Sequence, residues 1–302
     1  MNFSRRKLLS IGTAGLAGSL LPYTPLMAQT KIGEFTLTSL SDGSLTLPAS
    51  LVLGPIPEDA RAGAIAEFGL GEVLTPPCNV TLLQTGDRNI LFDVGAGSEF
   101  MSSAGFLLDA LDDIGLAPEE ITDIAFTHAH PDHLWGLVDD FDDLLFPNAR
   151  YMIGQTEWDY WTNPETVDTI DKGRTTFAVG AARRLSRIED NITFFKDGEE
   201  VLPGVAARAT FGHTPGHMAF EVRQGANAMM ILGDSIGNGH IALAHPDWKT
   251  GSDQNMDMGA ATRRSLLDQI THDQIAVLGF HLPGDGVGHI ERAGDGYRFS
   301  PV

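Results

Sequence analysis

Cysteine is almost absent from this chain. Its 302 residues include one cysteine, Cys78, and a single thiol cannot form an intrachain disulfide. Cys78 lies outside every segment that we identify below as metal-binding, and it precedes an apolar strand expected at 80–83. We therefore expect Cys78 to be a small buried residue rather than a functional thiol.

Basic residues are also scarce. Lys and Arg number 20 against 40 Asp and Glu, which gives a formal net charge of −20 at pH 7. Without the leader described below, which carries Arg5, Arg6 and Lys7, the net charge is −23. Such an acidic surface argues against nucleic acid and anionic membranes as partners. It also disfavours strongly anionic substrates, unless a bound metal reverses the charge locally.

Apolar runs of membrane length are missing. The longest candidate, at 8–21, is too short for a comfortable span and is followed by Pro22 and Pro25. The sequence SRRKLL at 4–9 has the twin-arginine form of an export signal, which is used by proteins that cross the membrane already folded. We therefore expect 1–28 to be an export signal and the mature protein to be periplasmic, without stable membrane association.

The rest of the chain is typical of a single α/β domain at 29–302, because no linker separates a second domain. We expect hairpins at 35–47 and 80–92, helices at 58–68 and 106–114, and a helical insertion rich in aromatic residues at 155–190. The Pro-, Gly- and Ala-rich segment at 48–77 either covers a site or lies at a subunit contact, and a homodimer is one expectation for the assembly.

The most informative segment is HAHPDH at 128–133, which directly follows an apolar strand predicted at 121–127. Side chains at i and i+2 of an extended segment point the same way, so His128 and His130 can reach one point together. Asp132 and His133 follow where the chain turns, and they can serve a second point nearby. This segment therefore offers partial ligand sets for two metal ions.

Further candidate ligands lie where other apolar strands end. His213 and His217 belong to a Gly- and Pro-rich turn, Asp234 follows the strand at 228–232, and His281 follows the strand at 275–280. Residues at the ends of buried strands form the sites of α/β folds. Imidazole and carboxylate ligands without thiolate suit zinc, iron, cobalt, nickel or manganese.

The motifs HxHxDH, then GHTPGH, then GD and a final His resemble those of the metallo-β-lactamase superfamily, over most of the mature chain. The resemblance implies an αββα four-layer sandwich that binds two divalent metal ions, with zinc as the expected metal. It assigns the ligands as follows: His128, His130 and His217 to the first metal, Asp132, His133 and His281 to the second, and Asp234 as a bridge. It also implies that Asp93 fixes a ligand histidine from outside the site and that His213 supports the site without binding metal.

A closer resemblance is to the methyl parathion hydrolase branch of this superfamily. It rests on the segments 145–149, 232–236 and 281–299. That branch contains dinuclear metal hydrolases of phosphotriesters, aryl esters and lactones. The implied function is hydrolysis of neutral esters, lactones or phosphotriesters by a hydroxide that bridges the metals, with Asp132 as a catalytic proton acceptor.

Two other functions stay open at this point. One is hydrolysis of thioesters or β-lactams, and the other is a mononuclear iron oxygenase acting on thiol or persulfide substrates, since that branch shares the HxHxDH motif. The number and type of bound metals would separate these functions. The substrate pocket is predicted to include Trp158 and Trp161, which share a helix face, although the same spacing also suits an anchor to the core.

Overall fold

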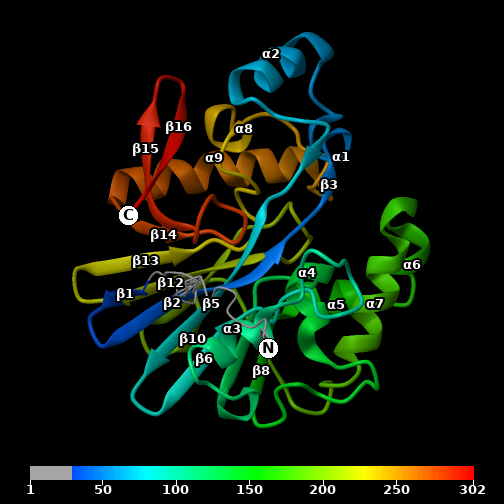
Figure 1. Cartoon of the computed structure of the whole chain (residues 1–302), viewed down its shortest axis with the longest axis vertical. Coiled ribbons are helices and arrows are strands. Elements are labelled where there is room, and N and C mark those ends of the chain that lie inside the picture. The colour runs from blue at the N-terminus through cyan, green and yellow to red at the C-terminus, as the bar shows by residue number, and fades with distance from the viewer. Residues whose placement is uncertain (1–28) are drawn as a thin grey trace, which may run out of the picture.

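Two sheets lie face to face at the centre of the chain, and helices cover the outer face of each sheet (Figure 1). The computed structural model describes residues 29–302. The predicted export signal at 1–28 lies outside the described residues. Within residues 29–302, no helix combines the length and the apolar character that a membrane crossing requires.

The first sheet has seven strands, and its last four are parallel to one another. In spatial order its strands are β1 (Gln29–Ile32), β2 (Phe35–Ser44), β5 (Pro77–Thr85), β6 (Arg88–Phe92), β7 (Asp123–Phe126), β8 (Arg150–Gly154) and β9 (Ile192–Phe195). The strands β3 (Leu47–Pro48) and β4 (Val73–Leu74) form a separate antiparallel pair.

The second sheet also has seven strands, which follow one another in sequence order. These are β10 (Glu200–Leu202), β11 (Val205–Ala209), β12 (Met218–Gln224), β13 (Asn227–Ile231), β14 (Ala276–Leu278), β15 (Val287–Ala293) and β16 (Gly296–Pro301). Only the pair β13 and β14 is parallel.

Helices form both outer layers, and further short helices lie in the connections at one edge of the sheets (Figure 1). The α-helices are α1 (Ala49–Leu53), α2 (Glu58–Phe68), α3 (Leu107–Asp113), α4 (Pro131–Leu134), α5 (Gln155–Thr162), α6 (Thr166–Thr169), α7 (Thr175–Leu185), α8 (Ile241–Ala244) and α9 (Met256–Asp273). Short 3₁₀ helices are η1 (Pro118–Glu120), η2 (Trp135–Leu137) and η3 (Lys172–Arg174).

Three apolar clusters hold these layers together. The strand β6 shows the arrangement, because Ile90 and Phe92 belong to the cluster between the sheets while Leu91 belongs to the cluster under α3 and α7. A third cluster joins the second sheet to α9 through Leu267 and Ile270. In the sequence, strands that are buried on both faces appear as continuous runs of apolar residues rather than as alternating apolar and polar residues. The predicted αββα four-layer sandwich is confirmed.

The hairpin predicted at 35–47 was wrong, whereas the hairpin predicted at 80–92 is confirmed by the antiparallel pairing of β5 and β6. β2 continues without a turn to Ser44 and pairs with β1 and β5. The physical reason is Asp42, whose buried carboxylate accepts the backbone N–H groups of Ala96 and Leu107. These bonds hold the residues of the expected turn against the segment between β6 and α3.

Candidate metal centre

Four strand ends meet at one edge of the two sheets. β6 and β7 are parallel neighbours in the first sheet, and β13 and β14 are parallel neighbours in the second. The chain reaches Asp93, His128, Asp234 and His281 within three residues of the ends of these strands. Carboxyl ends of parallel strands gather polar side chains at one place, so the topology alone brings these four residues together.

A first group of ligand atoms contains three imidazoles. His128, His130 and His213 each offer a ring nitrogen, and these atoms lie within 4.8 Å of one another. Nδ1 of His128 contacts Oγ1 of Thr127 at 3.0 Å, which leaves its Nε2 facing the group. Nε2 of His213 lies 2.8 Å from Nδ1 of His130. Nitrogen ligands in this number suit a zinc-type ion.

A second group adds carboxylates. Asp132, His133, Asp234 and His281 each offer one atom, again within 4.8 Å of one another, and all four are buried. Asp132 and His133 lie in α4, which begins at Pro131, where a proline is compatible with the first turn. Oδ2 of Asp132 is 3.2 Å from Nε2 of His281.

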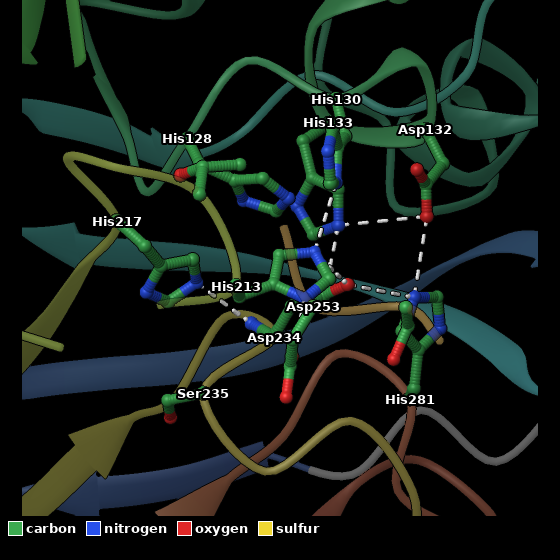
Figure 2. A network of polar contacts seen from close by, with 12 residues as sticks. His128, His130, Asp132, His133, His213, His217, Asp234, Ser235, Asp253 and His281 are labelled. Carbon is green, nitrogen blue, oxygen red and sulfur yellow. Dashed lines mark hydrogen bonds and ion pairs between the residues drawn. The ribbon is translucent and has the colours of Figure 1, made fainter. Parts of the chain in front are cut away.

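Asp234 lies between the two groups (Figure 2). Its Oδ2 is 3.3 Å from Nε2 of His213 in the first group and 3.3 Å from Nε2 of His281 in the second. Its Oδ1 is 3.2 Å from Nε2 of His133. One carboxylate thus contacts both groups, as a residue that bridges two ions must.

The residues present fit two metal ions. Among the described residues, four atoms of these groups are buried and have no hydrogen-bond partner: Nε2 of His128, Oδ2 of Asp132, Nε2 of His133 and Oδ1 of Asp234. Buried polar atoms are normally paired, because leaving one unpaired is costly. Coordination to two cations, one in each group, would satisfy all four.

The electrostatics of the second group are strongly coupled. Burial by itself lowers the pKa of His133 and His281, but Asp234 and Asp132 raise it, well above the usual range for His133 and to about 10 for His281. Burial raises the pKa of Asp234, yet His281, His133 and His213 hold it well below its usual range. The two carboxylates therefore require positive charge beside them, which either imidazolium or a metal supplies.

His217, the predicted third ligand of the first ion, lies beside the first group, with its ring centroid 4.8 Å from that of His128. Its Nε2 accepts the backbone N–H of Asp234 at 2.9 Å (Figure 2). Its Nδ1 lies 2.8 Å from Oγ1 of Thr210. Hydrogen bonds do not decide between His217 and His213 as the ligand, because both ring nitrogens of His213 also have polar partners. The assignment of His217 to the first ion stays a prediction, and His213 is a second candidate.

Asp93 lies behind the second group. Its Oδ2 is 2.7 Å from Nδ1 of His133, and its two carboxylate oxygens accept the backbone N–H and the hydroxyl of Thr127. Asp93 has a φ of 69°, which is a rare conformation for a residue with a side chain. The residue therefore directs Nε2 of His133 into the site, as the sequence predicted for a carboxylate outside the ligand set.

A cavity of about 940 Å³ opens above the two groups and exposes His130, Asp132, His213, Asp234 and His281 to it. Its walls come mainly from 45–53 and 69–77, from the α6–α7 region, and from the loops before α8 and α9. This combination of apolar walls and a few convergent polar groups is typical of a small-molecule site.

The two tryptophans do not line this cavity, which corrects the predicted pocket role. Trp161 is 1% exposed, and its ring lies edge-on to His130, with the ring centroids 5.7 Å apart. Trp158 packs instead against Phe194 in the first sheet's last strand. The aromatic residues that do line the cavity are Phe100, Tyr160 and Phe177.

Sequence reasoning missed several residues around the groups. Asp253 lies 3.3 Å from Nδ1 of His213, and the amide of Gln254 lies 3.3 Å from Nε2 of His130. Buried Glu157 contacts both loops that carry the first group. The sequence contained a signal for Glu157, which is a carboxylate on the aromatic face of a predicted helix. A carboxylate in such a place requires specific hydrogen-bond partners.

Comparisons with known proteins identify the family. The family model described as the metallo-beta-lactamase superfamily matches residues 74–293. No curated sequence matches this chain. The structure is similar to that of AidC, a dizinc quorum-quenching lactonase in complex with a product, with a TM-score of 0.85 and 26% identity over 91% of this chain and 97% of that chain.

Two further solved structures share the fold. The hydrolase AbOPH has a TM-score of 0.84 and 24% identity, over 91% of this chain and 97% of that chain. A probable metal-dependent hydrolase from Staphylococcus aureus has a TM-score of 0.74 and 20% identity, over 90% of this chain and 97% of that chain. The chain belongs to the metallo-beta-lactamase superfamily and is a metal-dependent hydrolase with a two-metal site.

Proposed function

We propose that the protein hydrolyses neutral lactones that carry an apolar acyl substituent. The observation that carries this proposal is the cavity of about 940 Å³, which reaches both groups of ligand atoms and has largely apolar walls. The similarity to AidC, whose structure holds the product of a lactone opening, supports the same substrate class.

The walls fit an acyl chain better than a charged substrate. The apolar side chains that line the cavity are Leu45, Leu47, Leu51, Val52, Leu70, Val73, Leu74, Phe100, Ile170, Phe177 and Met256. Each buried methylene of an acyl chain contributes about 0.8 kcal/mol, so affinity is expected to rise with chain length until the cavity is filled.

In the proposed mechanism, His128 and His130 would hold the first ion together with His217 or His213. Asp132, His133 and His281 would hold the second ion, and Asp234 would bind both. Such ions would activate a water as the nucleophile and polarise the carbonyl oxygen of the substrate. Asp132 lines the cavity and is the group that we propose accepts the proton of the attacking water. No serine or cysteine nucleophile is required.

Phosphotriesters and aryl esters form a second candidate substrate class. The segments 145–149, 232–236 and 281–299 resemble those of the methyl parathion hydrolase branch, and this resemblance supports testing them. A mononuclear iron oxygenase has less support, because the second ligand group suits a second ion. Thioester and β-lactam hydrolysis also fit a two-metal site, and the substrate screen separates them from lactone hydrolysis.

The test is a hydrolysis screen on protein with its metal content measured. Acylated homoserine lactones of increasing chain length, aryl esters, a phosphotriester, a thioester and a β-lactam are compared by kcat/KM. We expect two zinc-like ions per chain and the highest kcat/KM for lactones, rising with chain length. A single redox-active iron, or turnover unaffected by complete metal removal, would contradict the proposal.

Export and assembly are separate proposals. We propose that 1–28 direct the folded chain to the periplasm, leaving a mature domain at 29–302, and that the mature protein is a homodimer. Fractionation of cells that express the wild type and an Arg5→Lys/Arg6→Lys variant tests export, since only the wild type should reach the periplasm. Light scattering of the mature protein gives the mass that tests the dimer.

A further inference from the structure

Glu157 is a fully buried carboxylate beneath the first group of ligands. It lies in α5, is 0% exposed, and receives four hydrogen bonds. Oε1 accepts the backbone N–H of Ala129 at 2.9 Å and Nε1–H of Trp161 at 2.6 Å. Oε2 accepts the hydroxyl of Thr214 at 2.7 Å and the backbone N–H of Gly216 at 2.9 Å. Both oxygens of this carboxylate are thus hydrogen-bonded to donors of the protein itself.

The partners of Glu157 belong to the two segments that carry the first group. Ala129 lies between His128 and His130, and Thr214 directly follows His213. These segments are far apart in sequence, and the two oxygens of one carboxylate contact one segment each. Glu157 therefore links the two segments, and it is not among the residues that line the cavity.

Trp161 extends this support to the ring of His130. Its indole is held by Oε1 of Glu157, and its ring lies edge-on to the imidazole of His130, with an interplanar angle of 74°. Packing of this kind restricts the rotation of His130. The buried position of Trp161 is therefore explained by support of a ligand rather than by contact with substrate.

We propose that Glu157 is a positioning residue for the first metal ion, which it aligns through the backbone at Ala129 and Gly216, the hydroxyl of Thr214 and the indole of Trp161. This rests on the proposed assignment of that ion to His128, His130 and a histidine of the turn at 213–217, in which Thr214 follows His213 and Gly216 precedes His217. Residues that orient ligands from outside the coordination sphere typically change metal affinity or activity 10–100-fold.

Only a carboxylate matches this set of partners. The two backbone N–H groups and the indole N–H can only donate, so the group that faces them must accept on both oxygens. A glutamine of the same size presents an NH₂ group to one pair. That group can still donate to the hydroxyl oxygen of Thr214, but it leaves the N–H of Gly216 without an acceptor.

The second group has its own support. His133 is oriented by Asp93, and Nδ1 of His281 lies 2.7 Å from the backbone carbonyl oxygen of Pro77. None of these contacts involves Glu157. Asp93 also accepts the hydroxyl of Thr127, which contacts Nδ1 of His128, so a change at Asp93 is expected to weaken both ions and the second one more. A change at Glu157 is expected to weaken one ion only, and this difference separates a positioning role from a general loss of stability.

The experiment measures zinc binding by Glu157→Gln, Asp93→Asn and the double variant in competition with a chromogenic chelator. Asp159→Asn is the matched control, because Asp159 lies on the same helix and is exposed. We expect Glu157→Gln to weaken one ion 10–100-fold and to keep the other at wild-type affinity, with an unchanged far-UV circular dichroism spectrum. Asp93→Asn should weaken the other ion more strongly than this one, so that the double variant weakens both.

Two milder variants keep the test decisive if Glu157→Gln does not fold. Thr214→Val and Trp161→Phe each remove one donor and leave the carboxylate in place, and each should weaken the same single ion by a smaller factor. Wild-type affinity for both ions in all these variants, or equal weakening of both, would overturn the positioning role and leave the proposed function intact. A wild-type protein that binds no pair of ions would overturn both.

Discussion

His213 and His217 lie four residues apart in one loop, yet their ring nitrogens have different partners. His213 faces His130 and Asp234, whereas both nitrogens of His217 are engaged by Thr210 and by the backbone of Asp234. Gly233 permits this second contact, since a Cβ there would lie 2.7 Å from Nε2 of His217. The loop therefore offers two candidate ligands for the first ion.

Two substitutions separate these candidates. The predicted ligand is His217, so His217→Gln should lose one metal ion and lower kcat/KM by more than about 100-fold, because a ligand contributes more than the supporting residues around it. His213→Ala should keep both ions and lower kcat/KM less. Metal analysis and lactone kinetics check both variants. Loss of an ion only in His213→Ala would overturn the assignment made from sequence.

The sequence placed both histidines at the site, and the choice of His217 as the ligand rested on the resemblance between motifs. Three other predicted ligands follow the carboxyl end of an apolar strand, and His213 stands in that relation to β11, whereas His217 precedes β12. The structure brings both histidines to the first group. Position relative to the strands therefore does not decide which of the two binds metal.

At the scale of elements, the spacing of apolar residues in the sequence predicted strands and helices well where only local structure mattered. The hairpin of β5 and β6 and the helix α2 were predicted close to their observed bounds. The hairpin at 35–47 was wrong because Asp42 binds a loop about fifty residues later in the chain, and no local pattern reports such a contact. The prediction of the residues that line the pocket was wrong for the same reason, because α5 directs Trp161 toward His130 rather than toward the cavity.

The wall of the cavity is an assembly of separate elements that meet at Gly251. The N–H of Gly251 donates to the carbonyl oxygen of Val52 at the end of α1, at 3.0 Å. Its own carbonyl oxygen accepts Nη2–H of Arg174 at 2.7 Å. A Cβ at Gly251 would lie 1.8 Å from the carbonyl oxygen of Leu51, so the backbones cannot move closer or accept a side chain.

Gly251→Ala is therefore predicted to separate α1 from this loop and to widen the cavity. We expect KM for a long-chain lactone to rise about 10-fold, equivalent to about two methylenes of lost contact, with kcat within about twofold and two ions still bound. Gly63→Ala in α2 is the matched control, because nothing lies within 4 Å of its added Cβ. The same rise in KM for a short-chain lactone would argue against a role of this wall in binding the acyl chain.

At the scale of the whole molecule, the site joins the two sheets. Asp93 and His128 follow strands of the first sheet, and Asp234 and His281 follow strands of the second. Each ion proposed here is held by residues from both sides, since His281 and a histidine of the turn at 213–217 reach across from the second sheet. Bound metal is therefore expected to stabilise the packing of one half against the other.

Metal removal should lower the melting temperature. An ion that binds only the folded state at a free concentration 1,000 times its Kd contributes about 4 kcal/mol. For a domain of this size, that corresponds to a fall of roughly 10 °C when one such ion is removed. Differential scanning calorimetry before and after dialysis against a chelator measures this change.

The expected stabilisation has a specific source in the site. Without a cation, the carboxylates of Asp132 and Asp234 stay buried beside each other and rely on protonated His133 and His281 for compensation. Adding two equivalents of zinc should restore both the melting temperature and the lactone hydrolysis, whereas magnesium, which prefers oxygen ligands, should restore neither. A melting temperature unchanged by chelation, in protein shown to have lost both ions, would mean that the two halves pack without help from the metals.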